Sequence, residues 1–255
     1  MTEISFFQLT DAGCVQRENQ DAVGAWPHDD GMVFAVADGL GGAPAGQVAS
    51  QLALDVLARE IDRAPAGWGV PKRLRRAVQE ANLEIYTKGV TVPDLRRMGS
   101  TLTVSAVAGG TLTAAHVGDT RLYLYRDRAL AQLTKDHTWV EEQVGYGLLA
   151  PVDARAHPRR GVLTRSLGHE LVVAIDVLTI ALRPGDVLLH CSDGLHELLA
   201  DVELAEILTA HDPEAACRAL VRRGREEGGT GNLSAQVAAI RRCPAPARSW
   251  WRRGR

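Results

Sequence analysis

The sequence predicts an α+β fold in which antiparallel strands and paired helices form a layered sandwich. Strand-like segments fall into two blocks, and each block is followed by a pair of amphipathic helices rather than alternating with single helices. The chain has 255 residues, 45% of them apolar, and no internal repeat or linker divides it. We therefore expect one domain over residues 1–242, followed by a tail over 243–255.

In the first block, short apolar runs between turns predict strands near 4–10, 21–26 and 32–37. A helix is expected after Pro44, a residue that suits the first helical turn. Its apolar face would consist of Val48, Leu52, Val56, Leu57 and Ile61. A second helix over 72–88 repeats the pattern with Leu74, Val78, Ala81 and Ile85. These two helices are expected to form one layer.

In the second block, alternation predicts an antiparallel meander of strands at 101–107, 112–117, 121–126 and 129–133. A polar helical piece near 136–148 and an irregular segment near 150–162 follow, and such a segment often covers a site. The remaining pattern predicts strands at 171–182 and 186–191, helices at 194–210 and 213–227, and a last strand at 233–241.

Composition narrows the function classes. The 29 Lys and Arg residues nearly balance the 31 Asp and Glu residues, so no broad nucleic-acid footprint is expected. The four cysteines form no CxxC pair, which favours reduced thiols in a cytoplasm. The chain shows neither a signal peptide nor a membrane span, and no heptad or symmetric patch, so a cytoplasmic monomer is expected. The tail, with its Pro, Arg and two Trp residues, is expected to be a frayed end.

Aspartates at turns just after apolar strands are the most informative feature. Asp38-Gly39 follows an apolar run over 33–37, and Asp193-Gly194 follows another over 187–191. With Asp21, these strand ends would form an all-oxygen pocket for hard divalent cations, which indicates hydrolysis at phosphorus. Asp-Gly alone is more often a structural turn, so the weight lies in the co-occurrence.

Seven segments, in order over more than two hundred residues, resemble the metal-dependent serine/threonine protein phosphatases of the 2C type in their short bacterial form. The segments are Asp11-Ala-Gly-Cys-Val-Gln-Arg17-Glu-Asn19-Gln-Asp21, Ala37-Asp38-Gly-Leu-Gly-Gly42, Gly99-Ser-Thr-Leu-Thr103, Val117-Gly-Asp119-Thr-Arg121, Leu133-Thr-Lys-Asp136-His, Thr164-Arg-Ser-Leu-Gly168 and Cys191-Ser-Asp193-Gly-Leu195. The resemblance implies a four-layer sandwich, with a central antiparallel β-sandwich flanked by helix pairs.

It also implies a centre of two Mg²⁺ or Mn²⁺ ions. Asp38 would bridge both ions, Asp21 would hold the second together with the carbonyl of Gly39, and Asp193 would hold the first. Asp119 matches a residue that binds a third, looser ion in bacterial relatives. Two such ions share and activate a water molecule, so no protein nucleophile is required.

Arg17 matches the phosphate-binding arginine of the family, and a planar guanidinium suits two phosphoryl oxygens at once. The implied substrates are phosphoserine and phosphothreonine in proteins, opposing a serine/threonine kinase. The segment His190-Cys191-Ser192 lacks a nucleophile elbow and is interpreted as the end of a core strand. His137 and His157 are expected at exposed positions of the segment that covers the site.

Two departures from the family pattern matter. Leu40 stands where several eukaryotic relatives have a proton-donating histidine, which leaves the acid unassigned. Gly231 stands where the third carboxylate of the first metal site is expected, and no aspartate follows Asp212. Glu226 and Glu227 are expected to face solvent. The hypothesis is an enzyme that is weaker, or needs more Mn²⁺, than ordinary members.

Two alternatives stay open at this point. A pseudophosphatase would keep the fold and bind a phosphoprotein or another partner without turnover, and Gly231 is the feature that favours it. A hydrolase of small phosphoesters would use the same metal centre, and only the segment near 136–162 would distinguish its substrates.

Overall fold

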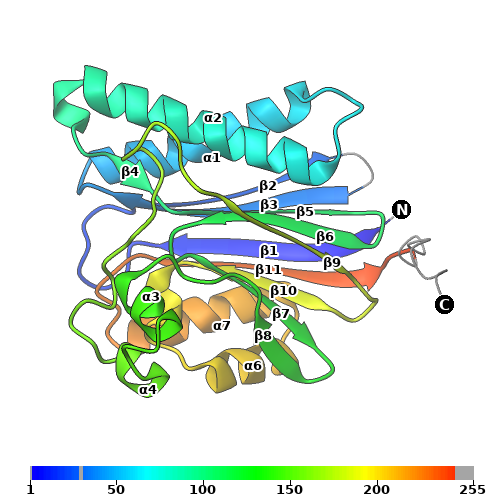
Figure 1. The fold of residues 1–255 in the computed structure, drawn as a ribbon. Helices are drawn as coiled ribbons and strands as arrows, with labels where there is room; N and C mark the ends of the chain where they lie inside the picture. The colour runs from blue at the N-terminus through cyan, green and yellow to red at the C-terminus, as the bar shows by residue number, and fades with distance from the viewer. Residues whose placement is uncertain (1, 29–30, 245–255) are drawn as a thin grey trace.

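Two antiparallel sheets lie face to face between two layers of helices in the computed structural model, which describes residues 2–28 and 31–244 (Figure 1). The first sheet has the order β1 (Glu3–Asp11), β11 (Leu233–Arg242), β10 (Val187–Cys191), β7 (Arg121–Arg126) and β8 (Ala129–Gln132). The second has the order β2 (Asp21–His28), β3 (Gly31–Leu40), β5 (Leu102–Ala108), β6 (Thr111–Val117) and β9 (Asp176–Ala181), with β4 (Gly99–Ser100) paired to β3. The expected four-layer α+β sandwich is confirmed.

Helices cover the outer face of each sheet. The second sheet packs against α1 (Ala45–Arg63) and α2 (Val70–Thr91), which a short 3₁₀ turn η1 (Pro93–Leu95) follows. The first sheet packs against α6 (Asp201–Ala210) and α7 (Pro213–Glu226). Helix α7 starts with Pro213 after an Asp212 N-cap, whose Oδ1 accepts from the Ala215 N–H at 3.0 Å. Between the sheets, Phe34, Leu122 and Leu188 are fully buried in a third apolar cluster.

Most residues that were expected on the apolar faces of the first two helices are buried. Leu74, Val78, Ala81 and Ile85 are all buried on α2, and Val56, Leu57 and Ile61 are buried on α1. Pro44 is the N-cap of α1 rather than part of its first turn. The expected helix over 194–210 is wrong in one respect, since α5 (Asp193–His196) and α6 are separate helices. The strand expected at 171–182 is only β9.

The expected meander is also wrong. Strand β6 belongs to the second sheet and β7 to the first, so residues 118–120 carry the chain from one sheet to the other. An apolar alternation predicts a strand but does not tell which of two sheets it joins. This crossing brings the turn that contains Asp119 to the end of the sandwich.

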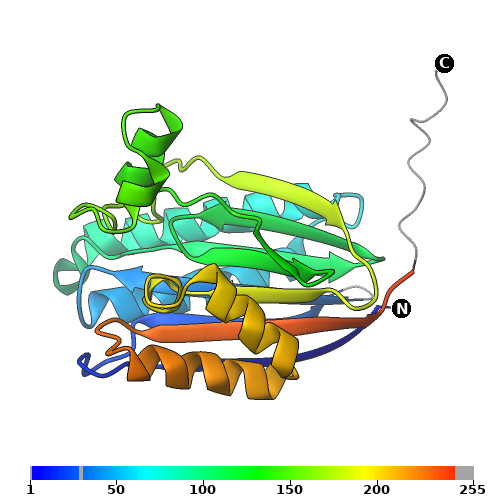
Figure 2. The ribbon, with the colours of Figure 1, turned by 90° about the horizontal axis from the view of Figure 1, so that it is seen from below.

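A segment over residues 139–162, called the flap below, stands off this end of the sandwich (Figure 2). It contains two short helices, α3 (Trp139–Gly145) and α4 (Pro151–Ala154), where a helical piece at 136–148 and irregular chain were expected. None of the helices in the described residues combines the length and hydropathy that a membrane-spanning helix needs. From residue 245 on, the predicted tail lies outside the described residues.

Candidate metal centre

The register of β2 and β3 places two of the expected ligands side by side. Asp21, the first residue of β2, pairs directly with Asp38 near the end of β3. Directly opposed residues of an antiparallel pair project from the same face, with Cβ atoms about 4.5–5.5 Å apart. The two carboxylates are therefore neighbours because of backbone hydrogen bonding alone.

The first sheet contributes Asp193 to the same end of the sandwich. The β10 strand ends at Cys191, and Asp193 begins α5 two residues later. Asp119 lies in the turn between β6 and β7 and is only 6% exposed. The carboxylates of Asp193 and Asp119 each interact electrostatically with that of Asp38. Four acidic side chains, from both sheets and the crossing between them, thus meet in one cluster.

Burial and mutual repulsion oppose the ionisation of this cluster. Burial, together with the Asp193 charge, raises the pKa of Asp21 to about 6 despite hydrogen bonds that favour the carboxylate. The pKa of Asp38 is raised well above its usual range by burial, then by the charges of Asp21, Asp193 and Asp119. The pKa of Asp119 is raised in the same way by burial and by Asp193 and Asp136. The cluster lacks positive charge, which bound cations would supply.

Hydrogen bonding leaves oxygens available to a cation. Asp21 Oδ2 accepts from Ser234 Oγ at 2.6 Å, whereas Oδ1 is buried without a hydrogen-bond partner. Such an orphaned buried carboxylate oxygen is unusual and fits a cation ligand. Thr101 Oγ1 accepts from the Asp38 N–H at 3.0 Å and holds the backbone there.

Gly39, whose carbonyl is the expected backbone ligand, lies in a tight place. A Cβ atom at this position would lie 2.0 Å from the Gly46 carbonyl oxygen and 2.7 Å from that of Gln20. The Gly39 N–H donates to the same Gln20 carbonyl at 3.1 Å. Only glycine permits this approach of the β3 end to the loop before β2.

The cluster is nevertheless not a preformed ligand set. Within residues 2–28 and 31–244, no group of three or more His, Cys, Asp and Glu side chains is arranged to hold a metal ion. The four aspartates nevertheless interact electrostatically, so their carboxylates lie close to one another. Uncompensated carboxylates repel one another and close to ligand distance only around a cation. The donors fit hard divalent ions with one carboxylate fewer than the family pattern.

That missing carboxylate is at Gly231, between α7 and β11. A Cβ atom there would have a single neighbour within 4 Å, the Gly194 Cα at 3.9 Å, and Gly194 directly follows Asp193. The position is open and lies next to the turn that carries Asp193. Glu226 and Glu227 are exposed, as expected, and do not replace the ligand.

Asn232 fulfils a role that the sequence analysis missed. Its Nδ2 donates to the carbonyls of Ala12 and Glu18 at 3.1 and 3.2 Å, and its Oδ1 accepts from the Gln20 N–H at 2.9 Å. Asn232 therefore fastens the loop before β2, which carries Arg17 and leads into Asp21. This role could have been predicted from the sequence, because the family pattern has Asp-Asn where this chain has Gly231-Asn232. Ser234 left no comparable signal.

Arg17 lies on this loop, is exposed, and forms no ion pair with another described residue. Leu40 lines a separate cavity of about 460 Å³ together with Arg165 and His169. His157 is half-buried, but His137 is only 4% exposed, so the expectation of an exposed position is wrong for His137. The strand end over 190–192 is fully buried, as expected.

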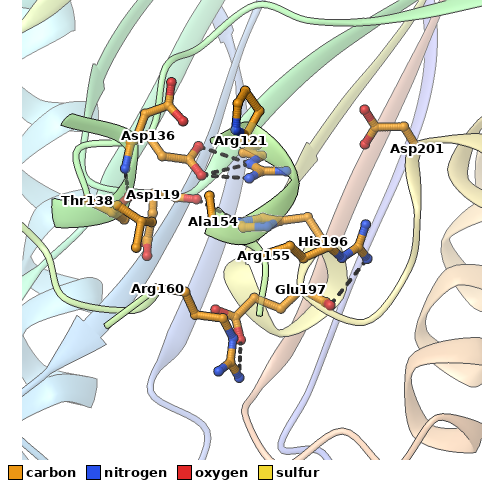
Figure 3. A pocket seen from close by; sticks show the side chains of 13 residues that line it. Asp119, Arg121, Asp136, Thr138, Ala154, Arg155, Arg160, His196, Glu197 and Asp201 are labelled. Carbon is orange, nitrogen blue, oxygen red and sulfur yellow. Dashed lines mark hydrogen bonds and ion pairs between the residues drawn. The ribbon is translucent and has the colours of Figure 1, made fainter. Parts of the chain in front are cut away.

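Beside Asp119, a cavity of about 250 Å³ opens under the flap (Figure 3). On the floor, Arg121 forms a bidentate pair with Asp136, with N–O distances of 2.7 to 3.1 Å. On the flap side, Arg160 forms an ion pair with Glu197 at 3.3 Å. The acidic cluster thus borders a space large enough for a substrate side chain, with guanidinium groups in its wall.

Comparison with known proteins gives a consistent picture. Residues 14–238 match the family model for protein phosphatase 2C. The serine/threonine protein phosphatase PstP of Mycobacterium tuberculosis is 38% identical over 232 residues, which are 91% of this chain and 44% of the relative. This chain therefore spans less than half of that protein's length.

Shorter relatives and solved structures match more fully. The serine/threonine phosphatase stp of Listeria monocytogenes is 37% identical over 203 residues, covering 78% of this chain and 81% of the relative. A crystal structure of the PstP catalytic domain in complex with two manganese ions superimposes with a TM-score of 0.82 at 34% identity. That match covers 94% of this chain and 99% of the other.

Proposed function

This chain belongs to the protein phosphatase 2C family, and we propose that it hydrolyses phosphoserine and phosphothreonine in proteins with the help of divalent metal ions. The observation that carries the proposal is the meeting of four aspartates at one end of the sandwich, where Asp21 and Asp119 are buried and Asp38 and Asp193 are half-buried. The similarity to named serine/threonine phosphatases supports the substrate class.

In this proposal, Asp38 would be a ligand of both ions, Asp21 and the Gly39 carbonyl would be ligands of one of them, and Asp193 would be a ligand of the other. When bound, two Mn²⁺ or Mg²⁺ ions supply an activated water molecule and positive charge for the phosphoryl oxygens. Asp119 contributes to a third, weaker site. The orphaned Oδ1 of Asp21 supports this assignment, as does the relative solved with two manganese ions.

Arg17 binds the phosphoryl group of the substrate. Its exposed position on the loop next to Asp21, without an ion-pair partner among the described residues, leaves its guanidinium available. Because an arginine presents parallel N–H donors, it orients two phosphoryl oxygens at once. Leu40 donates no proton, so no residue is assigned as the acid for the leaving group.

A second function has two observations in its favour. Gly231 supplies no carboxylate and the acidic side chains form no preformed set within the described residues. A pseudophosphatase that binds a phosphoprotein without turnover would show both features.

The single-domain assignment of 1–242, the monomeric state, the cytoplasmic location and the opposing kinase stay predictions.

The test is phosphate release from a phosphothreonine peptide and from p-nitrophenyl phosphate during titration with Mn²⁺ and Mg²⁺. We expect turnover that depends on metal and disappears in Asp38→Ala. Folded protein without turnover at millimolar metal, equal to the Asp38→Ala blank, would leave the binding module as the better account. Turnover of p-nitrophenyl phosphate alone would favour small phosphoesters.

A further inference from the structure

His137 binds both polar backbone groups of Gly118, the residue before Asp119. The His137 peptide N–H donates to the Gly118 carbonyl at 2.7 Å, and the His137 Nδ1 accepts from the Gly118 N–H at 3.0 Å. Both residues are buried, and the ring of His137 packs against that of His116 with centroids 4.7 Å apart. The His137 side chain thus holds the peptide that leads into Gly118, and the His137 backbone N–H holds the peptide that leads into Asp119.

The backbone conformation of the turn at Gly118 is also restricted by its surroundings. Gly118 has φ +106°, and a Cβ atom there would lie 2.5 Å from the Thr101 side chain. On the far side, His196 Nε2 donates to the Asp119 carbonyl at 2.8 Å. The backbone of Asp119 is therefore held from both sides, and its carboxylate lies within electrostatic reach of Asp193 and Asp38.

The outer edge of the His137 ring is held as well. Because Nδ1 accepts a hydrogen bond, the proton of the neutral ring is on Nε2, which donates to Asp176 Oδ2 at 3.2 Å. Arg165 in turn donates to Asp176 Oδ1 at 3.0 Å. Asp176 is the first residue of β9, and Arg165 follows the flap. The carboxylate therefore fixes both the tautomer and the orientation of the ring.

His137 is also the residue at which the two ends of the flap come together. Its carbonyl accepts from the Thr164 N–H at 2.8 Å, and the next pair, Trp139 N–H to Val162 carbonyl, is also 2.8 Å. Thr138 caps α3 directly after it. The flap base and the Asp119 turn therefore share one buried residue.

We propose that His137 is a positioning residue for Asp119, and that it fastens this carboxylate to the base of the flap. The inference rests on the proposed function, since it gives Asp119 the role of ligand for the weakest ion. Asp176 acts one step further out, by orienting His137. Outer partners of this kind affect metal affinity although they never touch the ion.

Two isosteric variants of the whole chain test the proposal. In His137→Asn the side-chain amide occupies the place of Nδ1 and can still accept from Gly118, whereas in His137→Gln it occupies the place of Nε2. Bound Mn²⁺ is counted by electron paramagnetic resonance, and the ion that Asp119→Asn removes identifies the site to follow. His211→Gln, an exposed histidine after α6, is the control.

We expect His137→Gln to weaken the Asp119-dependent ion by about 10- to 100-fold and His137→Asn to weaken it by less than about 3-fold. The remaining ions are expected to bind as in the wild type. Should His137→Gln fail to fold, Asp176→Asn carries the test, with a weakening of about 3-fold or more expected.

Equal affinity of the Asp119-dependent ion in wild type, His137→Gln and Asp176→Asn would overturn this inference and leave the proposed function standing. A wild-type protein that binds no Mn²⁺ at all would overturn both. A merely structural role of His137 would lower stability in the Asn and Gln variants alike and would not separate them by ion affinity.

Discussion

Gly231 lies beside the turn that carries Asp193, and we predict that a carboxylate at this position would complete the ligand set. Its Cβ position is open except for Gly194 Cα at 3.9 Å, and its backbone does not have a positive φ. An added aspartate would approach the turn that carries Asp193 without displacing backbone atoms. The residue is thus the most direct place to change metal affinity.

We predict that Gly231→Asp raises phosphatase activity at low Mn²⁺ and lowers the half-saturating Mn²⁺ concentration by about 10-fold or more. An added negative charge near two dications strengthens their binding. Activity measured over a Mn²⁺ titration checks this, with Gly231→Asn as the uncharged control of similar size. An unchanged half-saturating concentration would contradict the assignment of Gly231 to the missing ligand position.

Asp21 gives a second residue-scale prediction, on pH and stability. Its folded-state pKa, raised from 3.8 to about 6, means that ionisation costs folding free energy between these values. Stability from the protonated group is fully present below pH 3.8 and is lost as pH rises through about 6. In chelator, Asp21→Asn should therefore be more stable than wild type at pH 7, by about 3 kcal/mol.

That excess should shrink below pH 6 and vanish near pH 4, because the wild-type side chain is then neutral as well. Urea unfolding in EDTA at a series of pH values measures it. Taking the difference between the two proteins removes the opposing contribution of the buried His116, His190 and His196, whose pKa values are lowered to about 4, 3 and 4. An excess independent of pH would show that Asp21 is not buried as described.

At the scale of elements, the start of β11 holds the loop that precedes β2. Asn232 bridges them through three hydrogen bonds, to Ala12, Glu18 and Gln20. Further hydrogen bonds hold the two ends of the loop, from the Cys14 N–H to the Gly229 carbonyl and from Ser50 Oγ to the Gln20 carbonyl, whereas Arg17 and its neighbours are exposed. We expect the Asn232 bridge to contribute to the placement of Arg17 and Asp21.

Asn232→Ala is predicted to lower stability by about 2 kcal/mol, because three hydrogen bonds of the largely buried Asn232 side chain to part-buried backbone groups are lost. It should also raise the KM for a phosphopeptide, as Arg17 is no longer held near the cluster. Chemical denaturation and steady-state kinetics measure the two effects, with the exposed neighbour substitution Thr230→Ala as control. Wild-type KM in Asn232→Ala would mean that Arg17 is positioned in another way.

The elements also show how far the sequence alone could lead. Helices α1, α2 and α7 follow from periodicity, because each has one face against a core, whereas strands β3 and β11 follow from apolar runs that are buried on both faces. The destination of β7 did not follow, since its alternation is the same whichever sheet it joins. The break between α5 and α6 was not predicted, because the apolar pattern of the sequence continues across it.

The residues of the site were predicted only in part from the sequence. Asp21, Asp38, Asp119 and Asp193 occur at strand ends or turns that the resemblance identifies, and the structure brings them together. The burial of His137 could not be predicted, because it depends on His116 and Asp176 from two other strands. Asn232 could have been found from its place in the family pattern.

At the scale of the whole molecule, the two sheets are required to build one centre. The second sheet supplies Asp21 and Asp38, the first supplies Asp193 through β10, and the crossing at 118–120 supplies Asp119. The apolar cluster between the sheets, with Phe34, Leu122 and Leu188, keeps them in register. Metal binding is therefore a property of the assembled sandwich, and it should stabilise the folded chain by mass action.

The most direct measurement is the number of Mn²⁺ ions bound per chain, by electron paramagnetic resonance, with phosphothreonine turnover followed in the same samples. The account predicts at least two ions in the active wild type, and loss of both ions and turnover in Asp38→Ala. A wild-type chain that binds one ion or none and releases no phosphate would contradict it.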